Sequence, residues 1–363
     1  MKITVLQKDL TKILSHSSRF VSSRAQLPIL TNIKLAAQSS KLSIAATNLE
    51  MSCVASIGAQ VESEGEVAVP SRILVDLVGS LRSDKITLSS EGETLKIEAE
   101  GFKGSLAGLN TSDFPVVPSA LKESVALPKT DFLEAVGSTI FSCSTEASRP
   151  ALAGVLFIFS EHSLSLVASD GFRLSKKTVN MKGMKAAKLI LPKNILTELV
   201  RIAADAKKVS MEVSESERQV LFALDDVVIS SRLVEGEYPP FEKIIPTSSS
   251  INTNVSKADF AAAIKTASVF AREAANVIIL HIGEDTLKIS AESARAGSQE
   301  SSIAAKVDGP ELDIPYNYRF IEEFLNVAKG ESVVMKFNST TSPGVFLDAS
   351  DENYLHLIMP VKS

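Results

Sequence analysis

The histidines and cysteines are the residues most able to hold a metal ion, and the sequence keeps them apart. No histidine stands in the HxxxH or HExxH spacing that sets two imidazoles beside one zinc ion, and each is expected to be a surface or satisfied core residue. The four are His16, His162, His281 and His356. Cys53 and Cys143 form no CxxC pair, so we expect neither a zinc site nor a disulfide framework, but two small buried apolar groups.

The segment Ser169-Asp170-Gly171 could form a strained turn with a nucleophilic aspartate, as in a hydrolase. Such an enzyme would need a nearby perturbed acid and a metal or base, whereas Asp-Gly pairs are common in simple turns after strands. The acidic pairs Asp225-Asp226 and Glu322-Glu323 are expected to face solvent. The sequence contains no GxxxxGK[ST], GxGxxG or GxSxG motif. We therefore expect no catalytic residue, no bound metal and no cofactor.

Length and composition indicate a folded chain of two or three domains. It has 363 residues, of which 45% are hydrophobic and 22% charged, and it contains no run of eighteen apolar residues and no signal-peptide pattern. We expect no membrane association, and two unpaired cysteines fit a reducing cytoplasm. The net charge of −5 speaks against a generic nucleic-acid binder, so the distribution of charge matters more than its sum.

A repeated pattern of strand, proline and amphipathic helix runs through the chain. Pro70, Pro192 and Pro315 end three apolar strands and lie 122 and 123 residues apart. Proline suits the first turn of a helix, where its missing N–H costs nothing. Such near-equal spacing predicts three consecutive copies of one structural unit.

Two further triplets support the repeat. Asp9, Asp131 and Asp259 each stand near the start of a helical pattern, where a carboxylate complements the helix dipole. Alternating strands are predicted at residues 41–47, 163–169 and 286–292. Together they predict an α+β fold of three repeated domains with two helices and antiparallel sheets each, at residues 1–120, 121–248 and 249–363. Ser-rich residues 247–250 read as a linker.

Basic residues recur on matching helices of the repeats. They lie at Lys8, Lys12, His16 and Arg19, at Arg72 and Arg82, at Lys193, Arg201, Lys207 and Lys208, and at Lys257, Lys265 and Arg272. If these helices point the same way, they form a positive surface that could contact duplex phosphates without reading sequence. The alternative is that each set of charges simply solvates an outward face.

Several segments resemble the bacterial DNA polymerase III beta subunits, the sliding clamp family, along the whole chain. They are the opening MKITV, residues 24–30 (RAQLPIL), 47–50 (TNLE), 69–72 (VPSR), 113–115 (DFP), 168–174 (ASDGFRL) and 359–360 (MP). The resemblance implies half of a six-domain ring, a head-to-tail homodimer around double-stranded DNA, and an accessory subunit of the polymerase rather than an enzyme. It implies a clamp loader that opens the ring with ATP, and phosphate contacts by Arg24, Arg72 and Arg149.

The resemblance also implies a hydrophobic groove that binds short peptides of the Gln-Leu-x-Leu-Phe type. These peptides come from the replicative polymerase, the clamp loader and repair proteins. Its lining here is Arg149, Leu152, Ser169, Gly171, Phe172, Arg173, Leu174, Pro239, Ile244, Leu357, Met359, Pro360 and Val361. Without the resemblance, these residues would read as ordinary core between domains.

Two departures from the family pattern stand out. Phe172 replaces a frequent histidine, which makes the rim more apolar, and Glu146, Pro150 and Ala151 weaken the case for a DNA contact on that loop.

Unpaired strand ends in the first and third repeats predict the ring contact. Residues 104–109 should pair with a strand of the partner's third repeat, and Val269 and Phe270 should pack near Leu106. The alternative function is a repeat-built scaffold that binds peptides and never encircles DNA.

Overall fold

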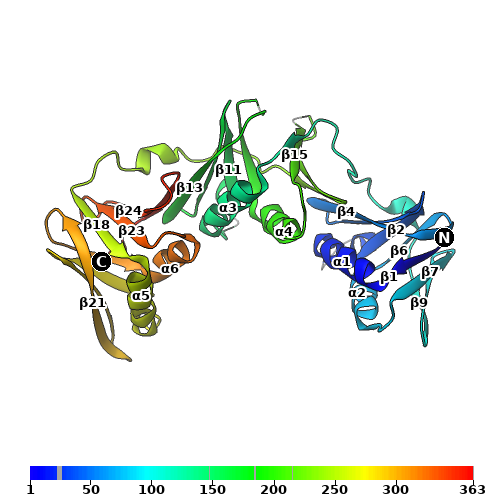
Figure 1. The fold of residues 1–363 in the computed structure, drawn as a ribbon, viewed down its shortest axis with the longest axis horizontal. Helices are drawn as coiled ribbons and strands as arrows, with labels where there is room; N and C mark the ends of the chain where they lie inside the picture. The colour runs from blue at the N-terminus through cyan, green and yellow to red at the C-terminus, as the bar shows by residue number, and fades with distance from the viewer. Residues whose placement is uncertain (23–26, 147, 184, 215, 363) are drawn as a thin grey trace. The chain divides into compact units, whose positions relative to one another are not determined.

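A computed structural model describes residues 1–22, 27–146, 148–183, 185–214 and 216–362. The chain forms two compact units, which are described separately (Figure 1). The first unit contains residues 1–129 and 194–233, and the second contains residues 130–193 and 234–363. Both are built from antiparallel sheets covered by helices.

The first unit holds two sheets. The five-stranded sheet runs β5 (Gln60–Ser63), β1 (Lys2–Leu6), β7 (Lys85–Glu91), β8 (Thr94–Ala99) and β9 (Phe102–Ala107). The eight-stranded sheet runs β10 (Val125–Ala126), β15 (Ser210–Ser214), β16 (Gln219–Leu224), β17 (Val227–Arg232), β4 (Met51–Gly58), β3 (Lys41–Thr47), β2 (Asn32–Gln38) and β6 (Gly65–Pro70). The β17–β4 pair joins strands far apart in the sequence into one sheet.

Three helices belong to this unit: α1 (Gln7–Ser17), α2 (Ser71–Ser80) and, apart from its first residue, α4 (Lys193–Ala203). Helix α1 packs on α2 and β4 (Figure 1). Its buried residues Leu10, Ile13 and Leu14 follow the i, i+3, i+4 spacing that places side chains on one helix face. The apolar stripe therefore fixes which face of the helix meets the sheet.

The second unit holds one sheet of twelve strands. It runs β14 (Ala187–Pro192), β11 (Gly154–Phe159), β12 (Ser163–Ser169), β13 (Arg173–Asn180), β25 (Tyr354–Ile358), β24 (Gly344–Asp348), β23 (Ser332–Phe337), β18 (Ile251–Ser256), β21 (Gly297–Asp308), β20 (Thr286–Ser293), β19 (Val277–Ile282) and β22 (Leu312–Asn317). The C-terminal strand β25 pairs with β13 from Arg173↔Ile358 to Lys177↔Tyr354. This register brings the C-terminal end of the chain to the turn that precedes β13.

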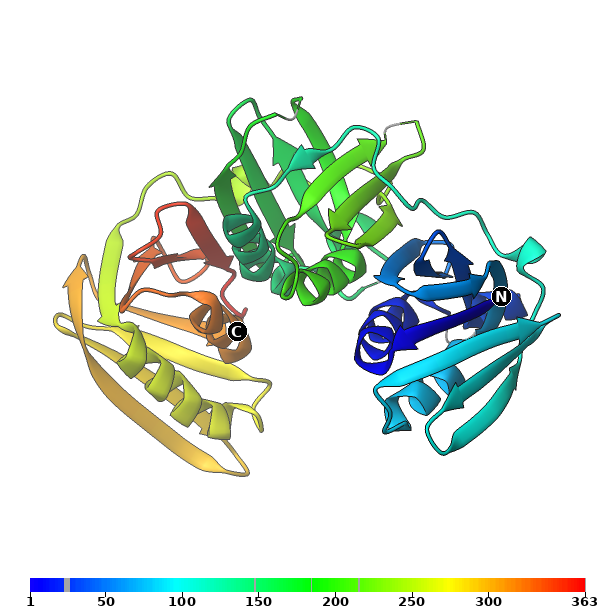
Figure 2. The same ribbon diagram turned by 45° about the vertical axis from the view of Figure 1, so that its right-hand side comes forward.

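The helices of this unit are α3 (Lys129–Thr139), which enters the unit after its first residue, α5 (Lys257–Ala271) and α6 (Tyr318–Val327). Helix α5 lies along β20 and β21 (Figure 2) and contacts α6. The core between helices and sheet is rich in aromatic side chains, including Phe260, Phe324 and Phe346. Their burial fixes α6 against the sheet.

The structure confirms the predicted α+β class and its antiparallel sheets. The strands predicted at residues 41–47, 163–169 and 286–292 are β3, β12 and β20, and the three aspartates lie in the first turns of α1, α3 and α5. The described residues contain six α-helices.

The predicted strand ends are confirmed at Pro70 and Pro192, but the placement of the three prolines in first helical turns was wrong. Pro70 and Pro192 are the last residues of β6 and β14, and Pro315 lies within β22, so none of them is in a first helical turn. Each lies in an outermost strand of its sheet, β6, β14 or β22, where a missing N–H can face away from the ladder. None of the helices in the described part of the chain is long and apolar enough to cross a membrane.

Candidate functional site: a braced turn beside the C-terminal strand

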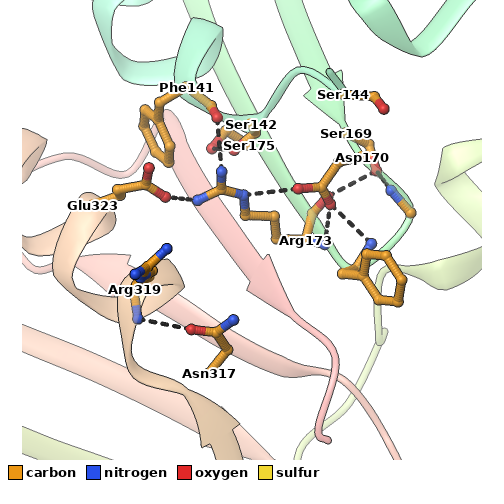
Figure 3. Close-up of polar contacts among 12 residues, drawn as sticks. Phe141, Ser142, Ser144, Ser169, Asp170, Arg173, Ser175, Asn317, Arg319 and Glu323 are labelled. Atoms are coloured by element: carbon orange, nitrogen blue, oxygen red, sulfur yellow. Dashed lines mark hydrogen bonds and ion pairs between the residues drawn. The ribbon is translucent and has the colours of Figure 1, made fainter. Parts of the chain in front are cut away.

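The turn between β12 and β13 is held by its own side chains (Figure 3). Asp170 Oδ1 accepts the backbone N–H groups of Phe172 at 2.9 Å and Arg173 at 3.0 Å. Ser169 Oγ donates to the Arg173 carbonyl at 2.7 Å and accepts from the Gly171 N–H at 3.1 Å. The Asp170 carboxylate thus stabilises the turn, as a simple Asp-Gly turn after a strand requires.

Gly171 is required by this turn for two reasons. Its φ is +93°, which a side chain would strain, and a Cβ there would lie 3.1 Å from Arg149 Nη1. The glycine therefore lets the exposed Arg149 side chain approach the backbone of the turn. Arg149 also lies 3.9 Å from Glu146 across an exposed ion pair, which is worth little energetically.

Arg173 points inward, behind the turn. Nε donates to Asp170 Oδ2 at 3.1 Å, Nη2 donates to the Phe141 carbonyl at 2.8 Å, and Nη1 forms an ion pair with Glu323 of α6. The Phe320 ring lies 4.4 Å from the guanidinium carbon. Burial lowers the pKa of Arg173, while Asp170 opposes this shift.

An apolar cluster lies beside the turn. Leu174 and Leu357, paired across β13 and β25, are fully buried in it, and Phe241 is buried beside them. Its other buried members are Leu156, Val167 and Ile190, and the half-buried Ala151, Tyr238, Ile245 and Met359 pack against it. Leu174 and Leu357, which are predicted groove residues, thus lie inside this apolar cluster, and Met359, another of them, lies at the margin of the cluster.

The C-terminal segment lies along the turn. The Met359 N–H donates to the Phe172 carbonyl at 2.8 Å, and the Val361 N–H donates to the Pro315 carbonyl at 2.9 Å. Pro360 lies half-buried between them. Phe172 itself is 60% exposed, although aromatic residues are usually more buried.

The remaining predicted lining residues differ in exposure. Ile244 is 44% exposed and Pro239 is exposed, and both flank residues that pack on the apolar cluster. Leu152 is buried in the 3₁₀ helix Pro150–Ala153. The structure thus gathers the turn, the C-terminal segment and Arg149, and it provides exposed apolar groups at Phe172 and Ile244.

Sequence reasoning missed three residues that hold Arg173: Phe141, Phe320 and Glu323. The expectation that Glu322-Glu323 only faces solvent was wrong for Glu323, which pairs with a buried guanidinium. Asp225 and Asp226 are exposed in the β16–β17 turn, as expected. Arg173, which closely follows the Asp170-Gly171 turn, could have indicated a buried ion pair, but no residue near it in the sequence identifies Glu323 as the partner.

A buried histidine lies close to the same network. His356 Nδ1 and Ser175 Oγ are 2.8 Å apart, and Ser175 Oγ lies 2.8 Å from Ser142 Oγ. The imidazole stacks on Phe324 with ring centroids 5.5 Å apart. Burial, reinforced by the charge of Arg173, lowers the pKa of His356 to about 3, so this ring is neutral at physiological pH.

The two cysteines are buried, as expected, and burial raises the pKa of each thiol to about 12. No group of three or more metal-ligating side chains occurs within the described ranges.

The predicted basic stripes are partly neutralised within the first unit. Lys12 lies 3.1 Å from Asp205, and Arg19 and Arg201 both lie near Glu198. Arg72 instead leaves 94% of its side chain exposed, and its Nε lies 4.0 Å from the Asp76 carboxylate one turn away. Arg24 lies outside the described residues.

Two strands offer backbone edges. β9, which carries the half-buried Leu106, is the last strand of its sheet. β21 pairs with β20 along residues 297–304, but its other side meets β18 only at residues 305–308 in the part of the chain that the structure describes. On α5, Val269 is 61% exposed and Phe270 is half-buried against the core.

The sequence matches three consecutive domains of one family. The N-terminal domain of the DNA polymerase III beta subunit matches residues 1–118, the central domain 126–240, and the C-terminal domain 242–362. The chain belongs to the DNA polymerase III beta subunit family. The predicted resemblance is therefore confirmed, and so is the sliding-clamp function that it carries.

Relatives and solved structures agree with this membership. Beta sliding clamps of Staphylococcus epidermidis and Staphylococcus aureus are 27% identical over 376 residues, with both chains covered completely. The Bacillus subtilis sliding clamp superposes with a TM-score of 0.95 at 27% identity, covering 100% of this chain and 99% of that one. The Thermotoga maritima beta subunit gives 0.93 at 23% identity, with the same coverage.

Proposed function

We propose that two copies of this chain close head to tail into a six-domain ring that encircles duplex DNA and tethers the replicative polymerase. The observation that carries this proposal is the match of three consecutive beta-subunit domains across nearly the whole chain. The domains span residues 1–120, 121–248 and 249–363. Each contributes a helix pair, namely α1 and α2, α3 and α4, and α5 and α6.

The ring closes through β9 of one subunit and β21 of the next. Both are edge segments with unpaired backbone groups, which pair readily with another strand. Leu106 on β9, with Val269 and Phe270 on α5, supplies apolar contacts around that joint. Completing the sheets between subunits satisfies these edges.

DNA is held by charge and topology. Arg24, Arg72 and Arg149 contact phosphates, and the exposure of Arg72 and Arg149 supports this role. Binding of this type falls steeply with salt and does not depend on base sequence.

Partner proteins bind at the turn beside the C-terminal strand. The polymerase, the clamp loader and repair proteins insert short peptides with Leu and Phe anchors at Phe172, Ile244 and Met359, above the base formed by Leu174 and Leu357. The groove also includes Arg149, Leu152, Ser169, Gly171, Pro239, Pro360 and Val361. Burying one such anchor contributes roughly 1.5–3 kcal/mol, and ordering the peptide offsets much of this, so micromolar affinity is expected.

The chain acts in the bacterial cytoplasm as a non-catalytic subunit without a cofactor. The deciding experiment loads the protein onto circular DNA with a clamp loader and ATP and then linearises the DNA. A ring slides off cut ends but stays on intact circles. Equal retention on both forms would favour the scaffold that binds peptides without encircling DNA.

A further inference from the structure

Arg173 connects three segments of the second unit. Its guanidinium reaches the turn through Asp170, the 3₁₀ helix Ile140–Ser142 through the Phe141 carbonyl, and α6 through Glu323. The side chain is buried, so solvent offers it no equivalent partner. Figure 3 shows the guanidinium between Asp170 on one side and Glu323 on the other.

Helix α6 presents two groups to this guanidinium from one face. Phe320 and Glu323 are three residues apart, which places them on the same side of the helix. The ring covers the guanidinium at 4.4 Å and the carboxylate forms its ion pair. Asn317 caps the helix by accepting the Arg319 N–H at 3.0 Å, which fixes the first turn next to Phe320.

The turn's own hydrogen bonds set its internal shape, but they do not set its position against the rest of the unit. Among the described residues, the side-chain hydrogen bonds of Asp170 and Ser169 stay within residues 169–173. The ladders of β12, β13 and β25 hold the two ends of the turn at Ser169 and Arg173. Beyond this pairing, the turn is tied to its surroundings by the side-chain contacts of Arg173 and by the 2.8 Å bond from the Met359 N–H to the Phe172 carbonyl. The position of the exposed Phe172, between these two ends, therefore depends in part on what holds the Arg173 side chain.

We propose that Glu323 is a positioning residue for peptide binding, which together with Phe320 holds Arg173 and so sets where the turn presents Phe172 to a bound peptide. This inference rests on the proposed peptide-binding function. It assigns Arg173 to the support of the groove, and it extends that support to a helix that the peptide need not touch.

The test compares E323Q with E322Q in the full-length chain. Glutamine keeps the size of the side chain and removes its charge, and Glu322 is a half-buried neighbour in the same helix without an ion pair among the described residues. Binding of a synthetic Gln-Leu-Ala-Leu-Phe peptide is measured by calorimetry. Hydrogen exchange of the Met359 amide reports independently on the contact between turn and C-terminal segment.

E323Q should bind the peptide about tenfold more weakly, a loss equivalent to about 1.4 kcal/mol, and its Met359 amide should exchange faster. E322Q should match the unsubstituted chain in both readouts. Unchanged affinity and exchange in E323Q, or equal losses in E322Q, would overturn the assignment.

A second pair of variants keeps the test informative if E323Q folds poorly. F320L removes the ring face and should weaken binding about threefold. In F320L/E323Q the losses should be less than additive, because both residues act through Arg173, whereas full additivity would contradict the proposal. If the unsubstituted chain binds no peptide, the groove proposal fails, and the exchange of the Met359 amide still decides whether Glu323 positions the turn.

Discussion

Deleting residues 359–363 should weaken peptide binding by at least about tenfold while leaving the unit folded. The deletion removes two backbone hydrogen bonds, from Met359 to Phe172 and from Val361 to Pro315, each worth about 1 kcal/mol. It also removes the half-buried Met359 side chain, which adds about 1 kcal/mol. Strand β25 ends at Ile358 and keeps its pairing with both β13 and β24. The structural loss is therefore local.

The affinity falls because a Leu or Phe anchor of the bound peptide would lose its contact with the deleted C-terminal segment. A Leu or Phe anchor contributes roughly 1.5–3 kcal/mol when buried, so exposing one anchor should weaken binding by about 10- to 150-fold. Calorimetry with a Leu- and Phe-anchored peptide measures this change. The matched control deletes only residues 362–363, since Lys362 is exposed. An unchanged affinity in the longer deletion, or an equal loss in the shorter one, would place the groove elsewhere.

Three further predictions concern assembly, DNA and pH. F270E should convert the dimer to monomers in sedimentation, because it puts a charge against the proposed joint, whereas V116E, at a fully exposed site, should leave the dimer intact. R72A should reduce the steepness with which the DNA-binding constant falls with salt, by about 0.9 in the slope of log K against log salt concentration. K12A should change this slope less, because Asp205 already neutralises Lys12. Equal changes in the two variants would contradict the assignment. The buried His356 has a folded-state pKa of about 3 against 6.5 when unfolded, so its contribution to stability is complete above about pH 6.5 and is lost as pH falls toward 3. H356N should therefore flatten the dependence of Tm on pH in that window, and identical slopes would refute the assignment.

Local patterns predicted the repeating elements well. The helix starts near Asp9, Asp131 and Asp259 and the strand at residues 41–47 follow from spacing and charge within a few residues. These elements can be predicted because the buried face of an amphipathic helix or strand is set by residues close together in the sequence.

The support of the candidate site could not be predicted in the same way. Glu323 lies 150 residues after Arg173 in the sequence, and only the β13–β25 pairing and the packing of α6 bring the two side chains together. A motif records the turn from Ser169 to Arg173, but not what braces it. The proposed lining of the groove came from the resemblance, which carries information about a whole fold that residue types alone do not contain.

The open side of β21 also affects the tendency of a newly made, unassembled chain to aggregate. Unpaired strand edges are templates for aggregation, and this one extends over residues 297–304 in the described structure. Its sequence there, GSQESSIA, is polar and includes a charge at Glu300, which disfavours the dry side-chain interfaces of amyloid. The β21 edge can therefore pair with a specific strand while disfavouring aggregation. Substituting its serines by valine or isoleucine should lower the solubility of the chain and promote aggregation.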